Sequence, residues 1–105
     1  MAIAWSDVVS LVGIQEGTDE YGFPVEETVI RENIYANKKS VRSNEYYLAK
    51  QSGINLSVMF EVRSIDYQGE EKLIYDGEEY IIERTYDRGE FVELTCSRKD
   101  DAHAN

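Results

Sequence analysis

The residues that could support catalysis are few, and their positions do not favour it. His103 is the only histidine and lies in a polar C-terminal tail, so it cannot pair with a serine or cysteine on a rigid element. Cys96 is the only cysteine, and it shares one strand face with Val92 and Leu94, which is typical of a buried structural thiol. We therefore expect that the protein is not an enzyme.

Pairs of adjacent carboxylates are the next candidates for acid–base or metal chemistry. They are Glu26 with Glu27, Glu70 with Glu71, and Glu78 with Glu79. Neighbouring residues on a strand point to opposite faces, so the two acids of a pair cannot converge on one substrate or ion. The chain also lacks a glycine-rich phosphate loop and a CxxC motif. These acids are predicted to lie on solvated strand edges, and no metal or cofactor is expected.

Basic residues gather in one stretch of an otherwise acidic chain. The net charge of −10 repels nucleic acid over most of the surface and argues against a general DNA-binding module. Residues 37–52 nevertheless carry one acid, Glu45, against four bases: Lys38, Lys39, Arg42 and Lys50. Such a cluster is either a solvated loop or a surface that meets DNA phosphate or an acidic neighbour.

The same stretch contains two of the eight tyrosines. Tyrosine is enriched both in strands and at protein interfaces, and packing within a sheet explains several of the eight. Tyr46 and Tyr47 fall on a predicted helix that is too short to own a core, so we assign them to an interface. The candidate partner-facing residues are therefore Lys38, Lys39, Arg42, Tyr46, Tyr47 and Lys50.

Residues 37–55 interrupt the β pattern and predict one short helix. Ser43 is placed to cap the helix N-terminus, and Glu45 lies in the first turn, where the helix dipole favours an acid. Lys50 falls in the last turn, and Gly53 lies where a C-cap needs a positive φ. About two turns are fewer than the ~12–15 residues that are marginally stable in water. The segment must therefore lean on other structure or be mobile.

Residues 72–98 predict a three-stranded antiparallel meander. Asp76 and Gly77 supply the two positive-φ residues of a type I′ hairpin turn, and residues 87–89 make the next reversal. In the last strand Val92, Leu94 and Cys96 alternate with polar residues, which predicts a strand with one buried face. One apolar face of this sheet must be covered by the rest of the chain.

The first half of the chain predicts a long hairpin. Residues 7–15 form a strand with two fairly apolar faces, which predicts burial on both sides, in a closing barrel or against a partner chain. Residues 17–24 hold the turn, and residues 25–36 return as a strand. The returning strand is expected to place four residues on one face: Thr28, Ile30, Ile34 and Ala36.

Residues 56–66 complete the expected strands. The chain is predicted to be a single domain, residues 1–105, that forms a small closed antiparallel six-stranded β-barrel with one short α-helix in a long connection. Residues 99–105 are predicted to be a frayed tail. One cysteine suits a reducing compartment, and we expect no signal peptide and no membrane span.

The C-terminal half resembles a known family. The resemblance lies in Ile65-Asp66-Tyr67, in Tyr75-Asp76-Gly77-Glu78-Glu79-Tyr80-Ile81-Ile82, in Arg84-Thr85-Tyr86, in the final Glu93-Leu94-Thr95-Cys96 strand, and in Ser43-Asn44-Glu45-Tyr46-Tyr47-Leu48-Ala49 with Gly53. These segments are similar to those of the head closure proteins of tailed bacteriophages, also called head-tail joining or stopper proteins. The resemblance covers about residues 30–98, and residues 1–29 show no match.

The resemblance implies a structural virion protein, assembled in the bacterial host cytoplasm. Members dock as a homo-oligomeric ring under the portal and adaptor, close the DNA channel after packaging, and offer the surface to which a tail completion protein attaches; the chain alone could be a monomer. The family's channel-closing loop corresponds to about residues 37–55, which could touch packaged DNA. The alternative is a small barrel of the OB or SH3-like kind that binds nucleic acid or peptide through aromatic residues in a basic groove.

Overall fold

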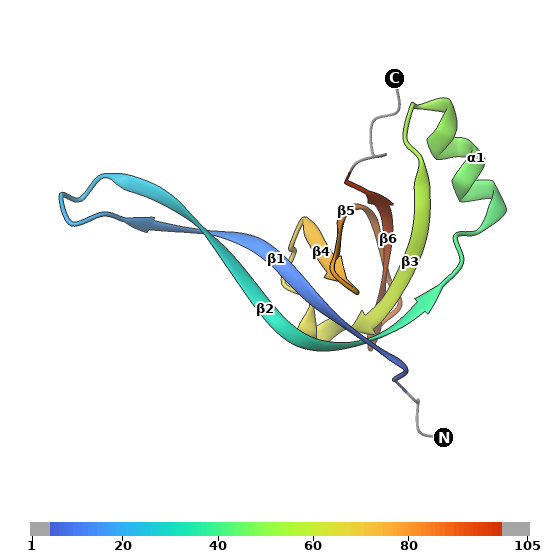
Figure 1. Ribbon diagram of the computed structural model, residues 1–105, viewed down its shortest axis with the longest axis horizontal. Coiled ribbons are helices and arrows are strands. Elements are labelled where there is room, and N and C mark those ends of the chain that lie inside the picture. Colours follow the sequence, from blue (N-terminus) through green and yellow to red (C-terminus); the bar gives the residue numbers. More distant parts are fainter. Residues whose placement is uncertain (1–4, 100–105) are drawn as a thin grey trace.

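The computed structural model describes residues 5–99 and contains a closed antiparallel barrel with the strand order β1-β2-β3-β6-β5-β4 (Figure 1). Its elements are β1 (Asp7–Thr18), β2 (Pro24–Lys39), α1 (Ser43–Gln51), β3 (Leu56–Arg63), the short 3-10 helix η1 (Ser64–Asp66), β4 (Lys72–Tyr75), β5 (Glu78–Asp87) and β6 (Phe91–Arg98). The predicted six-stranded barrel with one short helix is confirmed. Within residues 5–99, no helix is long and apolar enough to cross a membrane.

Apolar side chains from every strand fill the barrel interior. Phe60 lies at its centre and is fully buried, with ring centroids 5.0 Å from Tyr75 and 5.9 Å from Tyr80. The buried cluster consists of Val9, Leu11, Ile34, Ala36, Val58, Phe60, Val62, Leu73, Tyr80, Val92, Leu94 and Cys96. Because side chains occupy this interior, binding surfaces must be sought on the outside of the barrel.

Strands β1 and β2 extend beyond the barrel as a two-stranded arm, which we define as residues 13–30 (Figure 1). Only Ser10–Val12 of β1 pair with β4, and only Ala36–Lys39 of β2 pair with β3. In the arm the two strands pair solely with each other. The prediction that a closed barrel buries β1 on both sides is therefore wrong, since Ile14 is exposed, and cover by a partner chain stays a prediction.

A bulge at the base of the arm changes which side chains face the core. Val9 pairs with Ile34 but Leu11 pairs with Arg31, so β2 carries an extra residue, and Asn33 has a φ of 61°. The bulge reverses the alternation, which buries Ile34 but leaves Ile30 exposed. The prediction that Thr28, Ile30, Ile34 and Ala36 share one face is therefore wrong, since only Ile34 and Ala36 face the core.

Two further differences concern the segment between β3 and β4. Strand β3 ends at Arg63 and not at residue 66, because the backbone turns into η1, where the Ser64 amide donates to the Glu90 carbonyl oxygen at 2.9 Å. Glu70 is 7% exposed and accepts a hydrogen bond from Arg31 Nε at 2.8 Å. The expectation of a solvated Glu70 is therefore wrong, since the carboxylate anchors the base of the arm.

The turn between β4 and β5 confirms the prediction for Asp76 and Gly77, whose φ values are 52° and 77°. Replacing Gly77 with Val is expected to lower the free energy of unfolding by about 1–3 kcal/mol, because a β-branched residue is strained at positive φ. Nothing lies within 4 Å of a Cβ placed there, so the effect is backbone strain alone. Gly17→Val is the matched control, because its Cβ also meets open space without a positive φ. Equal thermal melts for the two variants would contradict the assignment.

Cys96 lies fully buried on β6, as predicted, and burial raises the pKa of its thiol to about 12. We expect a thiol reagent to label it slowly in the folded protein and rapidly in denaturant, because the thiolate is the reactive form. The unfolded thiol ionises from about pH 9 while the folded thiol stays protonated, so its contribution to stability is lost between about pH 9 and pH 12. Rapid labelling of the native protein would show that the thiol is accessible.

Candidate functional site: the Glu93 cluster and helix α1

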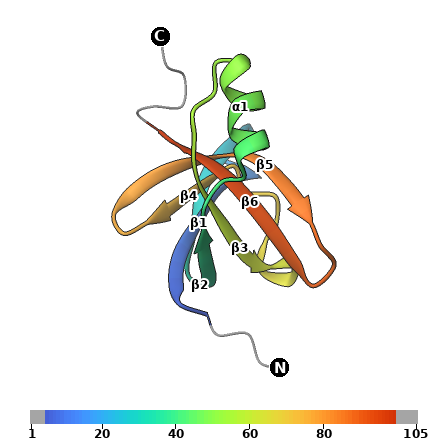
Figure 2. The ribbon, with the colours of Figure 1, turned by 90° about the vertical axis from the view of Figure 1, so that its right-hand side faces the viewer.

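The outer face of β3 and β6 is buried as well as the inner one. On β6, Glu93 is 1% exposed and Thr95 is also buried, and they pair in register with Glu61 and Met59 of β3. The prediction of one buried face and one open face for β6 is therefore wrong. The segment that joins β2 to β3, including α1, lies over this outer face (Figure 2).

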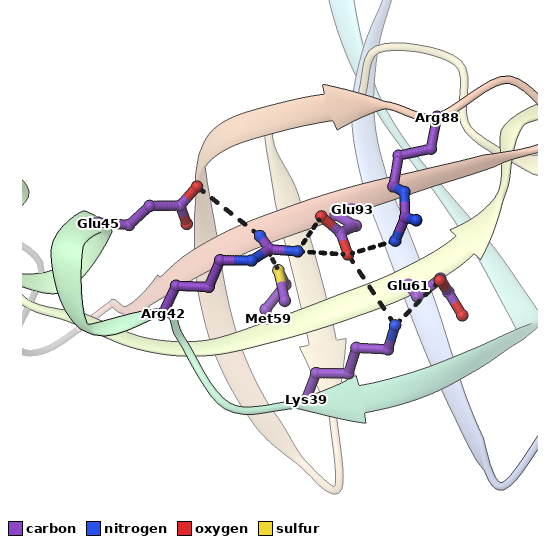
Figure 3. A network of polar contacts seen from close by, with 7 residues as sticks. All are labelled: Lys39, Arg42, Glu45, Met59, Glu61, Arg88 and Glu93. Atoms are coloured by element: carbon purple, nitrogen blue, oxygen red, sulfur yellow. Dashed lines mark hydrogen bonds and ion pairs between the residues drawn. The ribbon is translucent and has the colours of Figure 1, made fainter.

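The buried Glu93 carboxylate is surrounded by three cationic side chains, two from the stretch between the end of β2 and the start of α1 and one from the turn after β5 (Figure 3). Arg42 Nη2 donates to both carboxylate oxygens, at 3.1 Å and 3.2 Å, and Arg88 Nη1 donates to Oε2 at 3.4 Å. Lys39 Nζ lies 3.9 Å from Glu93 and 3.1 Å from Glu61 Oε2, so it bridges two acids that face each other across β3 and β6. We call these five residues, Lys39, Arg42, Glu61, Arg88 and Glu93, the Glu93 cluster.

The cluster anchors the start of α1 to the barrel. The hydrogen bond and the charge attraction between Arg42 and Glu93 raise the pKa of the Arg42 guanidinium. A buried carboxylate without partners is unfavourable, whereas Arg42 and Arg88 remain half-exposed and keep part of their hydration. Loss of the cations therefore costs the buried carboxylate more free energy than loss of the carboxylate costs the cations.

Helix α1 is short and packs lightly. It begins at Ser43, and Arg42 occupies the N-cap position without a side-chain capping bond, so the predicted capping role of Ser43 is wrong. Arg42 instead directs its side chain to Glu93 (Figure 3). The helix ends as predicted, with Gly53 at a φ of 82° and its amide bonded to the Lys50 carbonyl oxygen at 3.0 Å. Ala49 is the only buried residue of the helix.

The structure divides the predicted partner-facing residues into two groups. Lys39 and Arg42 belong to the Glu93 cluster. The other four lie elsewhere: Lys38 Nζ sits 5.4 Å from the Tyr75 ring centroid, Lys50 Nζ sits 5.6 Å from the Tyr46 centroid, and Tyr46 meets Tyr47 edge-on at 5.4 Å. Tyr47 is 64% exposed, so it is free to contact another molecule.

Sequence patterns do not indicate the acidic half of the cluster. Glu93 falls on the polar face of its predicted strand, and Glu61 falls on the less apolar face of residues 56–66. Each of the two acids lies between two apolar residues, Glu93 between Val92 and Leu94 and Glu61 between Phe60 and Val62, and this is the local signal. Within residues 5–99, no cluster of His, Cys, Asp and Glu side chains is arranged to hold a metal ion.

We expect the backbone amides of α1 to exchange with solvent much faster than those of β3 in the free protein. The helix has one buried residue, whereas six of the eight residues of β3 are buried, all except Ser57 and Arg63, and Met59–Val62 pair with both β2 and β6. Hydrogen exchange followed by mass spectrometry measures the difference. Equal protection of α1 and β3 would show that the Glu93 cluster makes the helix a fixed part of the barrel.

The comparison with known proteins assigns the chain to a family. A search of curated proteins finds no match. The family model described as phage head completion protein matches residues 7–99, which include the arm, the barrel and α1. The match extends the earlier resemblance through most of residues 1–29, where none had been found. The chain therefore belongs to the phage head completion protein family.

Proposed function

We propose that this protein closes the DNA channel of the phage head after packaging. In this proposal it docks as a ring under the portal and its adaptor, and it offers the surface to which a tail completion protein attaches. The observation that carries the proposal is the family match over residues 7–99, which supports a structural role in the phage head and a place in the virion. Assembly would take place in the host cytoplasm.

The shape of the protein agrees with a role in assembly. The filled barrel acts as a rigid body, while the arm projects from one end and α1 lies at the other (Figure 1). Projecting elements with exposed aromatic side chains, such as Phe23 and Tyr47, are typical of protein interfaces. These elements would contact the neighbouring subunits and the adaptor.

The segment from residue 37 to residue 55 is the part proposed to close the channel. It joins two adjacent strands, carries the lightly packed helix, and is tied to the barrel at its start by Arg42. Lys39 and Arg42 have their charges balanced by acids of the same chain. Contact with packaged DNA would therefore fall to Lys38 and Lys50, whose side chains have no ion pair within residues 5–99.

The proposal is tested with DNA-filled heads that lack this protein. Adding the purified protein should keep the packaged DNA inside the heads and protected from nuclease, while heads without it should lose their DNA. If the protein neither binds the heads nor reduces the loss, the proposal is wrong.

A titration with labelled oligonucleotide at low and moderate salt separates this function from that of a nucleic-acid-binding barrel. We expect no tight binding, since the chain is acidic and two of its clustered bases are paired internally. Tight binding that weakens with salt would favour the alternative function.

A further inference from the structure

The arm is acidic along its whole length. Residues 13–30 contain no base and five acids: Glu16, Asp19, Glu20, Glu26 and Glu27. Glu16 and Glu26 are direct partners in the pairing register of β1 and β2. Two like charges opposite each other weaken a strand pair. The arm has no cation of its own that would offset this repulsion.

The arm also exposes apolar side chains and open strand edges. Ile14 and Ile30 lie exposed near its base, and Tyr21 and Phe23 lie exposed at its tip, where Phe23 is 65% accessible. Beyond Val12, strand β1 has no partner other than β2. Exposed aromatic residues on a two-stranded ribbon with open edges are typical of a segment that is covered by another molecule.

A cleft of complementary character lies between α1 and β5. It encloses about 400 Å³ and is lined by Arg42, Glu45, Tyr86 and Arg88. Tyr86 is 62% exposed, and Arg84 lies two residues before it on β5, exposed and without an ion pair within residues 5–99. Glu45 is the one acid of the lining, and Arg42 and Arg88 also pair with Glu93 but remain half-exposed. We call Arg42, Arg84, Tyr86 and Arg88 the cleft surface. Arginine and tyrosine are the residues that most often anchor protein interfaces.

We propose that the arm of one copy docks in the α1–β5 cleft of the next copy, with the acids and aromatic side chains of the arm against the arginines and Tyr86 of the cleft surface. The occupant of the cleft is a second copy because this chain itself carries an acidic, aromatic element of matching charge. Two arms would repel each other, so an arm-to-arm contact is disfavoured. The inference rests on the ring in the proposed function and identifies the contact that builds it.

The placement of the two surfaces gives the contact a direction. The arm extends from one end of the longest axis, and α1 lies toward the other end (Figure 1). In the view from that other end, α1 and β6 face the viewer (Figure 2). A contact between two different surfaces on opposite sides of a subunit is heterologous, so it repeats from copy to copy and closes into a ring when the rotation allows.

Two variants, each with one damaged surface, test this head-to-tail arrangement. The arm variant carries Glu20→Lys and Phe23→Ser, and the cleft variant carries Arg84→Glu and Tyr86→Ser; none of these residues lies in the barrel core or in the Glu93 cluster. Analytical ultracentrifugation should show concentration-dependent assembly of the wild type and monomers of each variant. An equal mixture of the two variants should form heterodimers and nothing larger, because only one intact arm–cleft contact remains.

Cross-linking detects the contact directly. Phe23→Cys and Tyr86→Cys, made in separate proteins with Cys96→Ala, should form a mixed disulfide at least about tenfold faster than Phe23→Cys with Ile65→Cys, a control at another exposed site. Added salt should reduce the difference.

Several results would overturn the inference: a wild type that stays monomeric together with equal cross-linking of the two pairs, or a mixture of variants that stays monomeric. If wild type is monomeric and only the arm variant fails to bind DNA-filled heads, the arm contacts another head protein. Either outcome leaves the proposed function intact, since that is measured by DNA retention with the wild-type protein.

Discussion

Replacing Glu93 with Gln is expected to lower the free energy of unfolding by about 1–3 kcal/mol, the range for a buried hydrogen-bonded charge whose partners are half-exposed. Glutamine has nearly the same size but no charge, and it places an NH2 group where a carboxylate oxygen accepts from a guanidinium. Arg42, Arg88 and Lys39 would then surround a neutral group. Urea unfolding of the variant and the wild type measures the change.

Glu78→Gln is the matched control, because Glu78 pairs with Arg98 on the exposed surface. Water screens exposed pairs, so this variant should unfold almost like the wild type. Glu93→Gln should also speed the exchange of the α1 amides, since Arg42 is the anchor at the start of the helix. Indistinguishable unfolding of the two variants would show that the Glu93 cluster does not hold the segment to the barrel.

Replacing residues 40–54 with a short glycine-serine loop is expected to abolish retention of packaged DNA and to leave the barrel folded. Lys39 and Met59 are direct partners across β2 and β3, so the two strands are close enough for a short connection. The core contains no residue from the removed segment. Removal of Arg42 leaves Glu93 exposed to water. The loss of stability is therefore confined to the contacts of the Glu93 cluster.

The matched control for this experiment is Glu93→Gln, which loosens the segment but keeps it in the chain. Heads that receive this control should retain DNA, whereas heads that receive the shortened protein should lose it. Far-UV circular dichroism shows whether the shortened barrel is folded. Retention of DNA by the shortened protein would mean that residues 40–54 do not close the channel.

The parts of the fold that depend on local chemistry could be predicted from the sequence. Asp76 and Gly77 are suited to a turn with two positive φ values, and both have them. Gly53 likewise ends the helix where a positive φ is needed. The alternation of Val58, Phe60 and Val62 places them in the core, because a strand has a period of two residues.

The parts that depend on contacts between distant segments could not be predicted. Glu93 is buried because Arg42, from a segment far away in the sequence, crosses the outer face of β6. The extra residue in β2 beside Asn33 changes the face of every residue toward the arm tip, and no local pattern marks it. Arg42, predicted to face DNA or a partner, also meets a carboxylate of its own chain.

The arm illustrates the same limit. Its apolar residues, such as Ile14 and Ile30, predict burial, and within a single subunit they are exposed. A sequence pattern reports that a surface will be covered but does not report whether the same chain covers it. For this protein we expect the cover to come from the assembled ring.

Single-particle imaging of DNA-filled heads bound by the purified protein tests the head closure function most directly. We predict a ring of this chain on the portal complex, with residues 40–55 of each copy directed toward the axis and the DNA density ending above them. Density for the chain elsewhere on the head, or DNA continuing through an open ring, would contradict it.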